Sequence, residues 1–248
     1  MRMLSRFWPL ALIMFLLALT AAGYLIWQRW RADPFSSGPA LAADAAENGE
    51  IVLFDDVTAF DPLPPGWGAR TFFNIPPTDY SLNEEENGPV LTCTTKAGGS
   101  ILARHTDIPL DRFPVLEWDW IVTKPIEARF DEDTPEGDDH PARFFLRFAD
   151  SEGKSSAAEI IWSNVKFQPG EFKIIHGFTH LVANGHDENA GQWFSEQANL
   201  AALFEKVTGK TSGGTLTALG FFCDSDNMKG SSQASFRNVR LVAAAAAG

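Results

Sequence analysis

A period-two alternation of apolar and polar residues runs through most of residues 51–242. In residues 115–122 (VLEWDWIV), a leucine, two tryptophans and a valine share one face, whereas Glu117 and Asp119 lie on the other. Residues 142–148 (ARFFLRF) follow the same pattern. Short strands with one buried face and almost no long helix predict an all-β fold, an antiparallel jelly-roll β-sandwich. Further strand-like runs, separated by Gly, Pro, Asn and Asp turns, occur at 51–54, 90–95, 158–163, 172–181, 218–223 and 234–241.

One short helix is predicted within this strand-rich region. Leucine, phenylalanine and valine residues recur between positions 200 and 207 at the spacing of one helical face. Asn199 can cap the first turn, and Gly209 can close the last one. We expect this helix to pack across one edge or end of the sandwich.

An uncharged apolar run of 21 residues, 7–27, precedes the sandwich region. At about 1.5 Å per residue a helix of this length is about 30 Å long, the thickness of the hydrocarbon core of a bilayer. The run is longer than a signal-peptide core, and a small-residue site at 40–42 lies well past its end. We predict an uncleaved transmembrane anchor that exports the domain behind it. The predicted parts are the signal-anchor 1–31, a flexible linker 32–50, the β-sandwich domain 51–242 and a disordered tail 243–248.

The chain outside the predicted anchor is strongly acidic. The whole chain has 20 Lys and Arg residues and 32 Asp and Glu residues, and four of the basic ones but none of the acidic ones lie in residues 1–31. The remainder therefore has 16 basic and 32 acidic residues, a net charge of −16. Such a surface repels nucleic acid and anionic lipid, which excludes a nucleic-acid partner. It suits a domain that is held off the membrane or that binds cations.

Cys93 and Cys223 each lie in a strand-like run, 130 residues apart. In an exported chain, an even number of cysteines permits a disulfide. The alternative is that both are small buried side chains on separate strands. The sequence leaves the two readings open.

Two acidic segments are candidate ligand sites. Residues 131–139 (DEDTPEGDD) contain six carboxylates, whose oxygen atoms suit calcium unless the segment is simply a solvated loop. A second polar segment follows the apolar strand 218–223 at its C-terminal end, where loops build binding sites, although an Asx turn is the alternative. We predict that the two segments meet in one polar cluster that binds a glycan or holds a cation. Its members are Asp138, Asp139, Arg143, Asp224, Asp226 and Asn227, and its candidate metal ligands are Asp138, Asp139, Asp224 and Asp226.

Aromatic residues and histidines add two further candidates. Trp118 and Trp120 share one face of a strand, so they either pack in the core or line a groove and stack on sugar rings. His176 and His180 are four apart, but they lie in a strand-like run without the glutamate of a metalloprotease motif. We interpret them as ordinary surface or half-buried histidines. No nucleophile elbow, phosphate loop or dinucleotide fingerprint is present, so the sequence does not identify a reaction.

Two longer motifs carry a family resemblance. Gly137-Asp-Asp-His-Pro-Ala-Arg143 precedes an apolar strand, and Gly220-Phe-Phe-Cys-Asp-Ser-Asp-Asn227 precedes a terminal strand with Phe236-x-x-Val-x-Leu241. Together they resemble the bacterial "domain of unknown function 3047" family. Shorter matching pieces are Leu63-Pro-Pro-Gly-Trp67, Trp118-x-Trp120, Ile161-Trp-Ser163 and Gly191-Gln-Trp193.

The resemblance implies an exported sandwich domain similar to galactose-binding-like and carbohydrate-binding-module jelly rolls. It implies no catalytic residue, because no activity is established for that family. The resulting expectation is a bacterial inner-membrane protein with a single span and a periplasmic domain that binds a glycan or a cation without catalysis. An accessory subunit of an integral membrane complex is the alternative, and a glycan-active enzyme is the third hypothesis.

Overall fold

A computed structural model of the chain describes residues 14–17, 20, 33–175 and 177–244. The chain divides into two compact units, residues 1–34 and 35–248, and the fold described below is that of the second unit. Among the described residues, no helix is long and apolar enough to cross a membrane. The predicted span 7–27 lies mostly outside the described residues.

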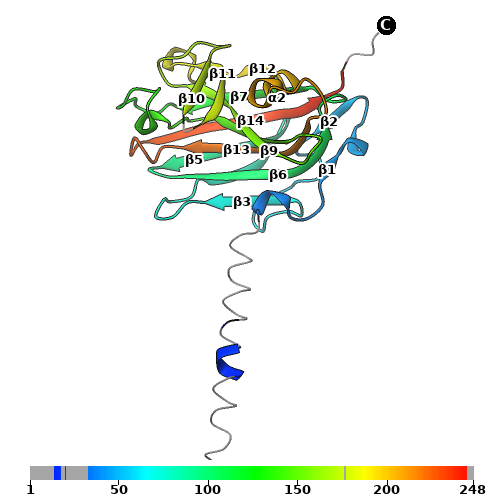
Figure 1. The fold of residues 1–248 in the computed structure, drawn as a ribbon. Helices are drawn as coiled ribbons and strands as arrows, with labels where there is room; N and C mark the ends of the chain where they lie inside the picture. The colour runs from blue at the N-terminus through cyan, green and yellow to red at the C-terminus, as the bar shows by residue number, and fades with distance from the viewer. Residues whose placement is uncertain (1–13, 18–19, 21–32, 176, 245–248) are drawn as a thin grey trace, which may run out of the picture. The chain divides into compact units, whose positions relative to one another are not determined.

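The second unit is an all-β sandwich of two sheets, as the alternation predicts, and its arrangement is consistent with a jelly roll (Figure 1). The predicted antiparallel pairing is wrong at two places, because β1 runs parallel to β6 and β9 runs parallel to β11. The larger sheet has the order β1 (Leu41–Ala42), β6 (Gly99–Pro109), β13 (Thr215–Asp224), β8 (Arg143–Ala149), β9 (Ser155–Ser163), β11 (Phe178–Gly185) and β10 (Phe172–Ile175), and β3 (Trp67–Thr71) also pairs with β6. The smaller sheet has the order β12 (Phe194–Asn199), β7 (Val115–Lys124), β14 (Ser231–Val242), β5 (Gly88–Lys96) and β4 (Asp79–Glu85), and β2 (Glu50–Val52) also pairs with β14.

The core lies between the two sheets and is rich in aromatic rings. Trp120 on β7 lies 5.8 Å from Trp162 on β9 and 6.2 Å from Phe236 on β14, measured between ring centroids. A disulfide joins Cys93 on β5 to Cys223 on β13 and so links the two sheets through this core. The alternating side chains of β7 and β8 thus face inward, and their polar neighbours face outward.

Several strands that lack a simple alternation were not predicted from the sequence. The long strand β6 is buried on both faces along most of its length, because residues near Phe35 pack against Ile101 and Ala103 on its outer side. A strand buried on both faces has no polar face, so it lacks a period-two signal. The run 172–181, expected as one strand, instead forms the antiparallel pair β10 and β11. The strands β3, β4 and β12 were also missed.

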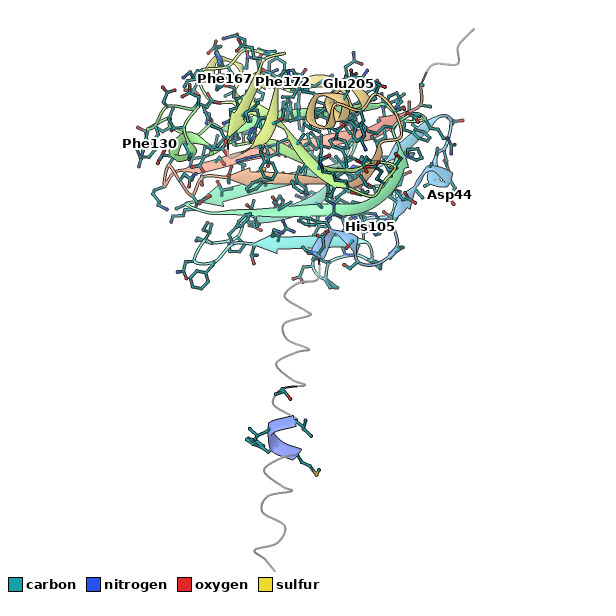
Figure 2. The ribbon with its side chains drawn as sticks, in the orientation of Figure 1. Asp44, His105, Phe130, Phe167, Phe172 and Glu205 are labelled. Atoms are coloured by element: carbon teal, nitrogen blue, oxygen red, sulfur yellow. A yellow bond between two sulfur atoms is a disulfide. The ribbon has the colours of Figure 1, made fainter. Side chains whose placement is uncertain are left out.

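In the described part of the sandwich unit, the α-helix α2 spans Leu200–Thr208 and has the predicted caps. The side chain of Asn199 accepts a hydrogen bond from the N–H of Ala202 at 2.9 Å, and Gly209 has a left-handed φ of 72°. Lys206 Nζ lies 4.8 Å from the ring centroid of Phe172, so the helix adjoins the edge strand β10 (Figure 2). Short 3-10 turns occur at Pro34–Ser36, Ala43–Ala45, Pro135–Gly137 and Asp187–Asn189.

The segments predicted as flexible linker and tail are partly fixed to the sandwich. Phe35 is only 1% exposed, and its ring lies 5.3 Å from that of Phe145. Leu41 and Ala42 form β1 beside β6, and the N–H of Ala243 donates to the carbonyl of Gly49. Burial of one aromatic ring and backbone pairing outweigh the linker-like composition, so the fold extends beyond residues 51–242.

Candidate functional site

A buried arginine is the centre of a charged network on the outer face of the larger sheet. The side chain of Arg143, at the start of β8, is 2% exposed. Its Nη1 donates to Glu159 Oε2 on β9 at 2.7 Å, and its Nη2 donates to Asp224 Oδ1 at the end of β13. The guanidinium carbon lies 4.2 Å from the ring centroid of Phe222. Since β8 lies between β9 and β13, Arg143 connects three neighbouring strands.

The network continues across the sheet to its edge. His180 on β11 is paired in register with Glu159, and its Nε2 lies 3.0 Å from Glu159 Oε2. Lys173 on β10 is paired in register with His180. The Nζ of Lys173 lies 2.7 Å from Asp138 Oδ1 and 2.8 Å from His140 Nε2. A continuous row of charged and polar side chains therefore crosses β10, β11, β9 and β8.

The connection between β7 and β8, residues 125–142, covers this row. Glu132 in this connection has a fully buried carboxylate that accepts hydrogen bonds from the backbone N–H groups of residues 164–166 at 2.9–3.0 Å. The same carboxylate accepts a hydrogen bond from the hydroxyl of Ser163 at 3.0 Å. Glu132 thus holds the connection to the turn that follows β9.

The predicted acidic segment 131–139 contains two kinds of carboxylate. Asp131 and Asp133 are largely exposed and form ion pairs with Lys166 Nζ at 2.8 and 2.5 Å. Glu132 and Asp139, in contrast, are 1% and 0% exposed. The segment is therefore neither a simple solvated loop nor a set of ligands that all converge on one point.

The surroundings of the network shift the pKa values of its members. Burial acts against ionisation of Glu159, but the charge of Arg143 and the hydrogen bond with His180 lower its pKa to about 2. Burial also opposes ionisation of Asp138, whose pKa is nevertheless lowered by His140 and Arg143. Burial and the charge of Lys173 lower the pKa of His140 to about 4, so its imidazole is neutral near pH 7.

Three carboxylates converge beside Arg143. Oxygen atoms of Asp139, Asp224 and Asp226 all lie within 4.8 Å of one another. Asp139 accepts hydrogen bonds from the N–H groups of Asn227 at 3.1 Å and Met228 at 2.6 Å. Burial raises the pKa of Asp139, and burial together with the charge of Asp139 raises that of Asp224. Acidic groups so close together share a proton or accept a cation.

The structure thus brings Asp138, Asp139, Arg143, Asp224 and Asp226 close together, with corrections to their expected roles. The carboxylate of Asp138 pairs with Lys173 and does not belong to the three converging carboxylates. The side chain of Asn227 points to a backbone group and donates to the carbonyl of Pro135 at 2.9 Å.

The predicted sugar-stacking tryptophans lie in the core. Trp118 and Trp120 are 1% and 0% exposed, and both rings contact Phe144 on the opposite sheet. Their inward direction follows from the alternation on β7, and the opposite sheet leaves no ring face open to a sugar. The expectation that their rings stack on a sugar is therefore wrong, although Trp118 does contribute to the lining of the cleft described next. His180 is also buried rather than half-exposed, and His176 lies outside the described residues.

An open cleft of about 600 Å³ lies on the outer face of the smaller sheet, across β12, β7 and β14. We call it the polar groove. Its side chains form two rows across the strands, because Ser195, Asp119 and Arg237 are neighbours in register, as are Gln197, Glu117 and Arg240. The residues that line the groove are Glu117, Trp118, Asp119, Ser195, Glu196, Gln197, Asn238 and Arg240.

An irregularity in β14 completes the polar groove. The register shifts between Arg237 and Arg240, and Asn238 within the shift has a positive φ of 53°. A bulge of this kind inserts an extra residue and changes where side chains point. It brings Arg237 and Arg240 opposite Asp119 and Glu117 respectively, although the two arginines are three residues apart.

The polar side chains of the groove fix one another. Glu117 Oε2 accepts hydrogen bonds from Arg240 Nε at 3.0 Å and Nη2 at 2.7 Å. Asp119 accepts from Ser195 Oγ at 2.6 Å, Asn238 Nδ2 at 2.7 Å and Arg237 Nε at 3.1 Å. Burial would raise the pKa of Asp119, but these hydrogen bonds lower it below its usual range.

Comparisons with known proteins identify the family but not the ligand. The family model described as "Protein of unknown function (DUF3047)" matches residues 65–240, so the chain belongs to this family. No curated protein matches the chain.

Several solved structures are similar in part. A thermostable cellulase derived from the Cel12A cellulase of Rhodothermus marinus has a TM-score of 0.41 at 10% identity, with 72% of this chain and 92% of that chain covered. The family 30 carbohydrate-binding module of a Clostridium thermocellum cellulosomal cellulase has a TM-score of 0.34 at 12% identity, with 70% and 85% covered. For the enzymatically active domain of bacteriophage CBA120 tailspike protein 4 the TM-score is 0.39 at 9% identity, and 72% of this chain but only 19% of that chain is covered. Such low scores and identities do not transfer a function to this chain.

The polar groove was not predicted from the sequence, and neither were Glu159 and Lys173 of the charged network. Glu117 and Asp119 were placed correctly on the polar face of their strand, but their partners lie on strands 76 to 123 residues away. Glu159 and Lys173 sit singly among apolar residues, which is the one signal that marked them in advance. An isolated charge in an apolar strand requires a buried partner.

Proposed function

We propose that this protein is a membrane-tethered, extracytoplasmic domain that binds carbohydrate in the polar groove without catalysis. The observation that carries the proposal is the open cleft of about 600 Å³ whose polar side chains are ordered in two cross-strand rows. Sugar hydroxyls donate and accept hydrogen bonds, and amide, hydroxyl, carboxylate and guanidinium groups complement both roles. Because hydrogen bonds already hold the groove side chains in place, little ordering is required when a ligand binds.

Two further observations support the location. The apolar run 7–27 has the length of a bilayer span, and it supports a single anchor in the bacterial inner membrane. The disulfide between Cys93 and Cys223 supports an oxidising compartment, since such bonds persist in the periplasm rather than in the cytosol. The proposed domain is therefore periplasmic.

The placement of the groove carboxylates favours binding over cleavage. Hydrolysis of a glycosidic bond needs one carboxylic acid that stays protonated near neutral pH. Asp119 has a lowered pKa, and Glu117 accepts two hydrogen bonds from Arg240. Burial raises the pKa of Glu196, but this residue alternates with Ser195 and Gln197 along β12, so its side chain points to the other face, where Asn184 Nδ2 donates to it at 2.7 Å. The acid with the raised pKa therefore faces away from a ligand in the groove.

The test is glycan binding by the full chain in detergent micelles, measured by glycan array and then by titration calorimetry. Replacement of Gln197 on the groove floor with alanine is expected to weaken binding several-fold. Gln233→Ala is the matched control, because it removes an amide from β14 at a position that does not line the groove. Absence of glycan binding by the native chain, or equal losses in both variants, would contradict the proposal.

A further inference from the structure

Two of the three acidic residues that line the polar groove are paired with arginines, and the third, Glu196, accepts a hydrogen bond from Asn184 Nδ2 at 2.7 Å. Glu117 is paired with Arg240 and Asp119 with Arg237. A second carboxylate lies near the same guanidinium, because Glu50 Oε2 is 3.7 Å from Arg240 Nε. An anionic ligand that approaches Arg240 would therefore also meet the negative charges of Glu117 and Glu50.

Two of the groups that remain available to a ligand are uncharged amides. Within the described residues, the amide of Gln197 makes no side-chain hydrogen bond, and it lies exposed on the groove floor. Asn238 uses its Nδ2 on Asp119, which leaves its carbonyl oxygen free to accept. A neutral hydroxyl can both donate and accept, so it matches these amide groups better than a carboxylate or a sulfate, which can only accept.

The charge of the surrounding chain acts in the same direction. Outside the predicted anchor the chain carries a net charge of −16. A field of this sign lowers the local concentration of polyanions around the groove, while a neutral ligand is unaffected. Both the arginine–carboxylate pairs of the groove and the negative charge of the chain therefore disfavour acidic glycans.

We infer that the polar groove selects uncharged glycans over acidic ones, through hydrogen bonds rather than ion pairs. This inference rests on the proposed function, because it names the ligand class of the same site. It predicts that binding depends little on ionic strength, since salt screens charge–charge attraction but not neutral hydrogen bonds.

The experiment compares two hexasaccharides, a neutral glucose oligomer and a galacturonic acid oligomer, by titration of the full chain in micelles. We expect the neutral oligomer to bind about ten-fold or more tightly than the acidic one, and its affinity to change by less than about two-fold between low and physiological salt. Tighter binding of the acidic oligomer, or a steep loss of neutral binding with salt, would overturn the inference while the carbohydrate-binding proposal survives. If neither oligomer nor any array glycan binds, both the proposed function and this inference fall.

A charge variant separates local pairing from overall charge. Glu117→Gln removes the main partner of Arg240, so we expect the ratio of the two affinities to shift towards the acidic oligomer by several-fold. Glu84→Gln is the matched control, because it removes one negative charge from the exposed strand β4 of the same sheet, outside the groove. An equal shift of the ratio in both variants would show that overall charge alone acts and would overturn the role of the Glu117–Arg240 pair. Melting temperatures of both variants confirm that each remains folded.

Discussion

The charged network on the larger sheet and the polar groove on the smaller sheet are built from the same kinds of side chain, but they differ in how accessible those side chains are. Each lies on an outer sheet face, and each sets carboxylates against arginines from neighbouring strands. In the network, Arg143 and Glu159 have side chains 2% and 6% exposed, whereas Arg240 and Glu117 in the groove are 39% and 31% exposed. The side chains of the groove are accessible to a ligand, whereas those of the network are buried and stabilise the fold.

The difference arises from the connections between strands. Residues 125–142 fold over the network and close it with Glu132, Asp138 and Asp139. Over the groove, the cleft stays open to solvent across β12, β7 and β14. A cluster of charged residues in a sequence therefore indicates a rigid attachment between two segments as readily as it indicates a binding site.

The largest expected effect follows from removal of the buried arginine. Arg143→Ala leaves Glu159 and Asp224 buried without their cation, and loss of one partner of a buried ion pair costs about 3–5 kcal/mol. We expect a large loss in the free energy of unfolding by denaturant. A loss below about 1 kcal/mol would show that the network does not hold the fold and that it resembles the exposed groove pairs in its contribution.

The second prediction concerns the pH dependence of stability. His140 has a folded pKa of about 4, below the unfolded value of 6.5. The unfolded chain therefore takes up this proton first, and stability is lost as the pH falls from 6.5 to 4, by up to about 3 kcal/mol. Glu159 adds a further loss as the pH falls from 4.5 towards its folded pKa of about 2.

Unfolding measured across this range separates the two groups. His140→Gln should flatten the slope between pH 6.5 and 4 and leave the loss below pH 4 in place. His105→Gln is the control, because that imidazole lies partly exposed on β6 and its Nδ1 contacts the carbonyl of Gly38 at 3.1 Å rather than a member of the network. An unchanged slope in His140→Gln would contradict the neutral state assigned to His140.

A smaller effect is expected at the bulge of β14. Asn238→Ala removes the hydrogen bond to Asp119 and places alanine at a φ of 53°, where asparagine is tolerated better. The expected loss is about 1 kcal/mol in stability, together with weaker glycan binding. If binding is unaffected while stability falls, the bulge serves the fold alone.

The smallest effect on stability is expected from the exposed groove arginine. Arg240→Ala should change the free energy of unfolding by no more than about 1 kcal/mol, because partly exposed ion pairs contribute little. The same chemical deletion at Arg143 should cost several times more. Equal losses at the two arginines would remove the distinction between network and groove.

The sequence was informative wherever a signal was local. Alternation in residues 115–122 and 142–148 predicted two inward-facing strands, and Asn199 and Gly209 predicted both ends of the helix α2. The motif around Arg143 marked residues that the structure does bring together. Each of these features depends on neighbours a few residues apart.

Features that depend on distant strands were not predictable in this way. The strand β6 has no alternation because both of its faces are covered, and the parallel pairing of β9 with β11 has no local signature. The polar groove requires the register of β12, β7 and β14 together. The disulfide between Cys93 and Cys223 likewise depends on the packing of the two sheets, which brings the two cysteines together.

We expect a glycan to bind in the polar groove and not at the charged network. The most direct test is titration of a neutral glucose hexasaccharide into the full chain in micelles, with Gln197→Ala and Asp138→Asn measured side by side. Asp138 is the suitable network position, because its side chain is 19% exposed and is therefore the member nearest to solvent in its row. We expect a several-fold loss of affinity in Gln197→Ala and an unchanged affinity in folded Asp138→Asn. Loss of binding in Asp138→Asn with normal binding in Gln197→Ala would instead place the ligand at the network.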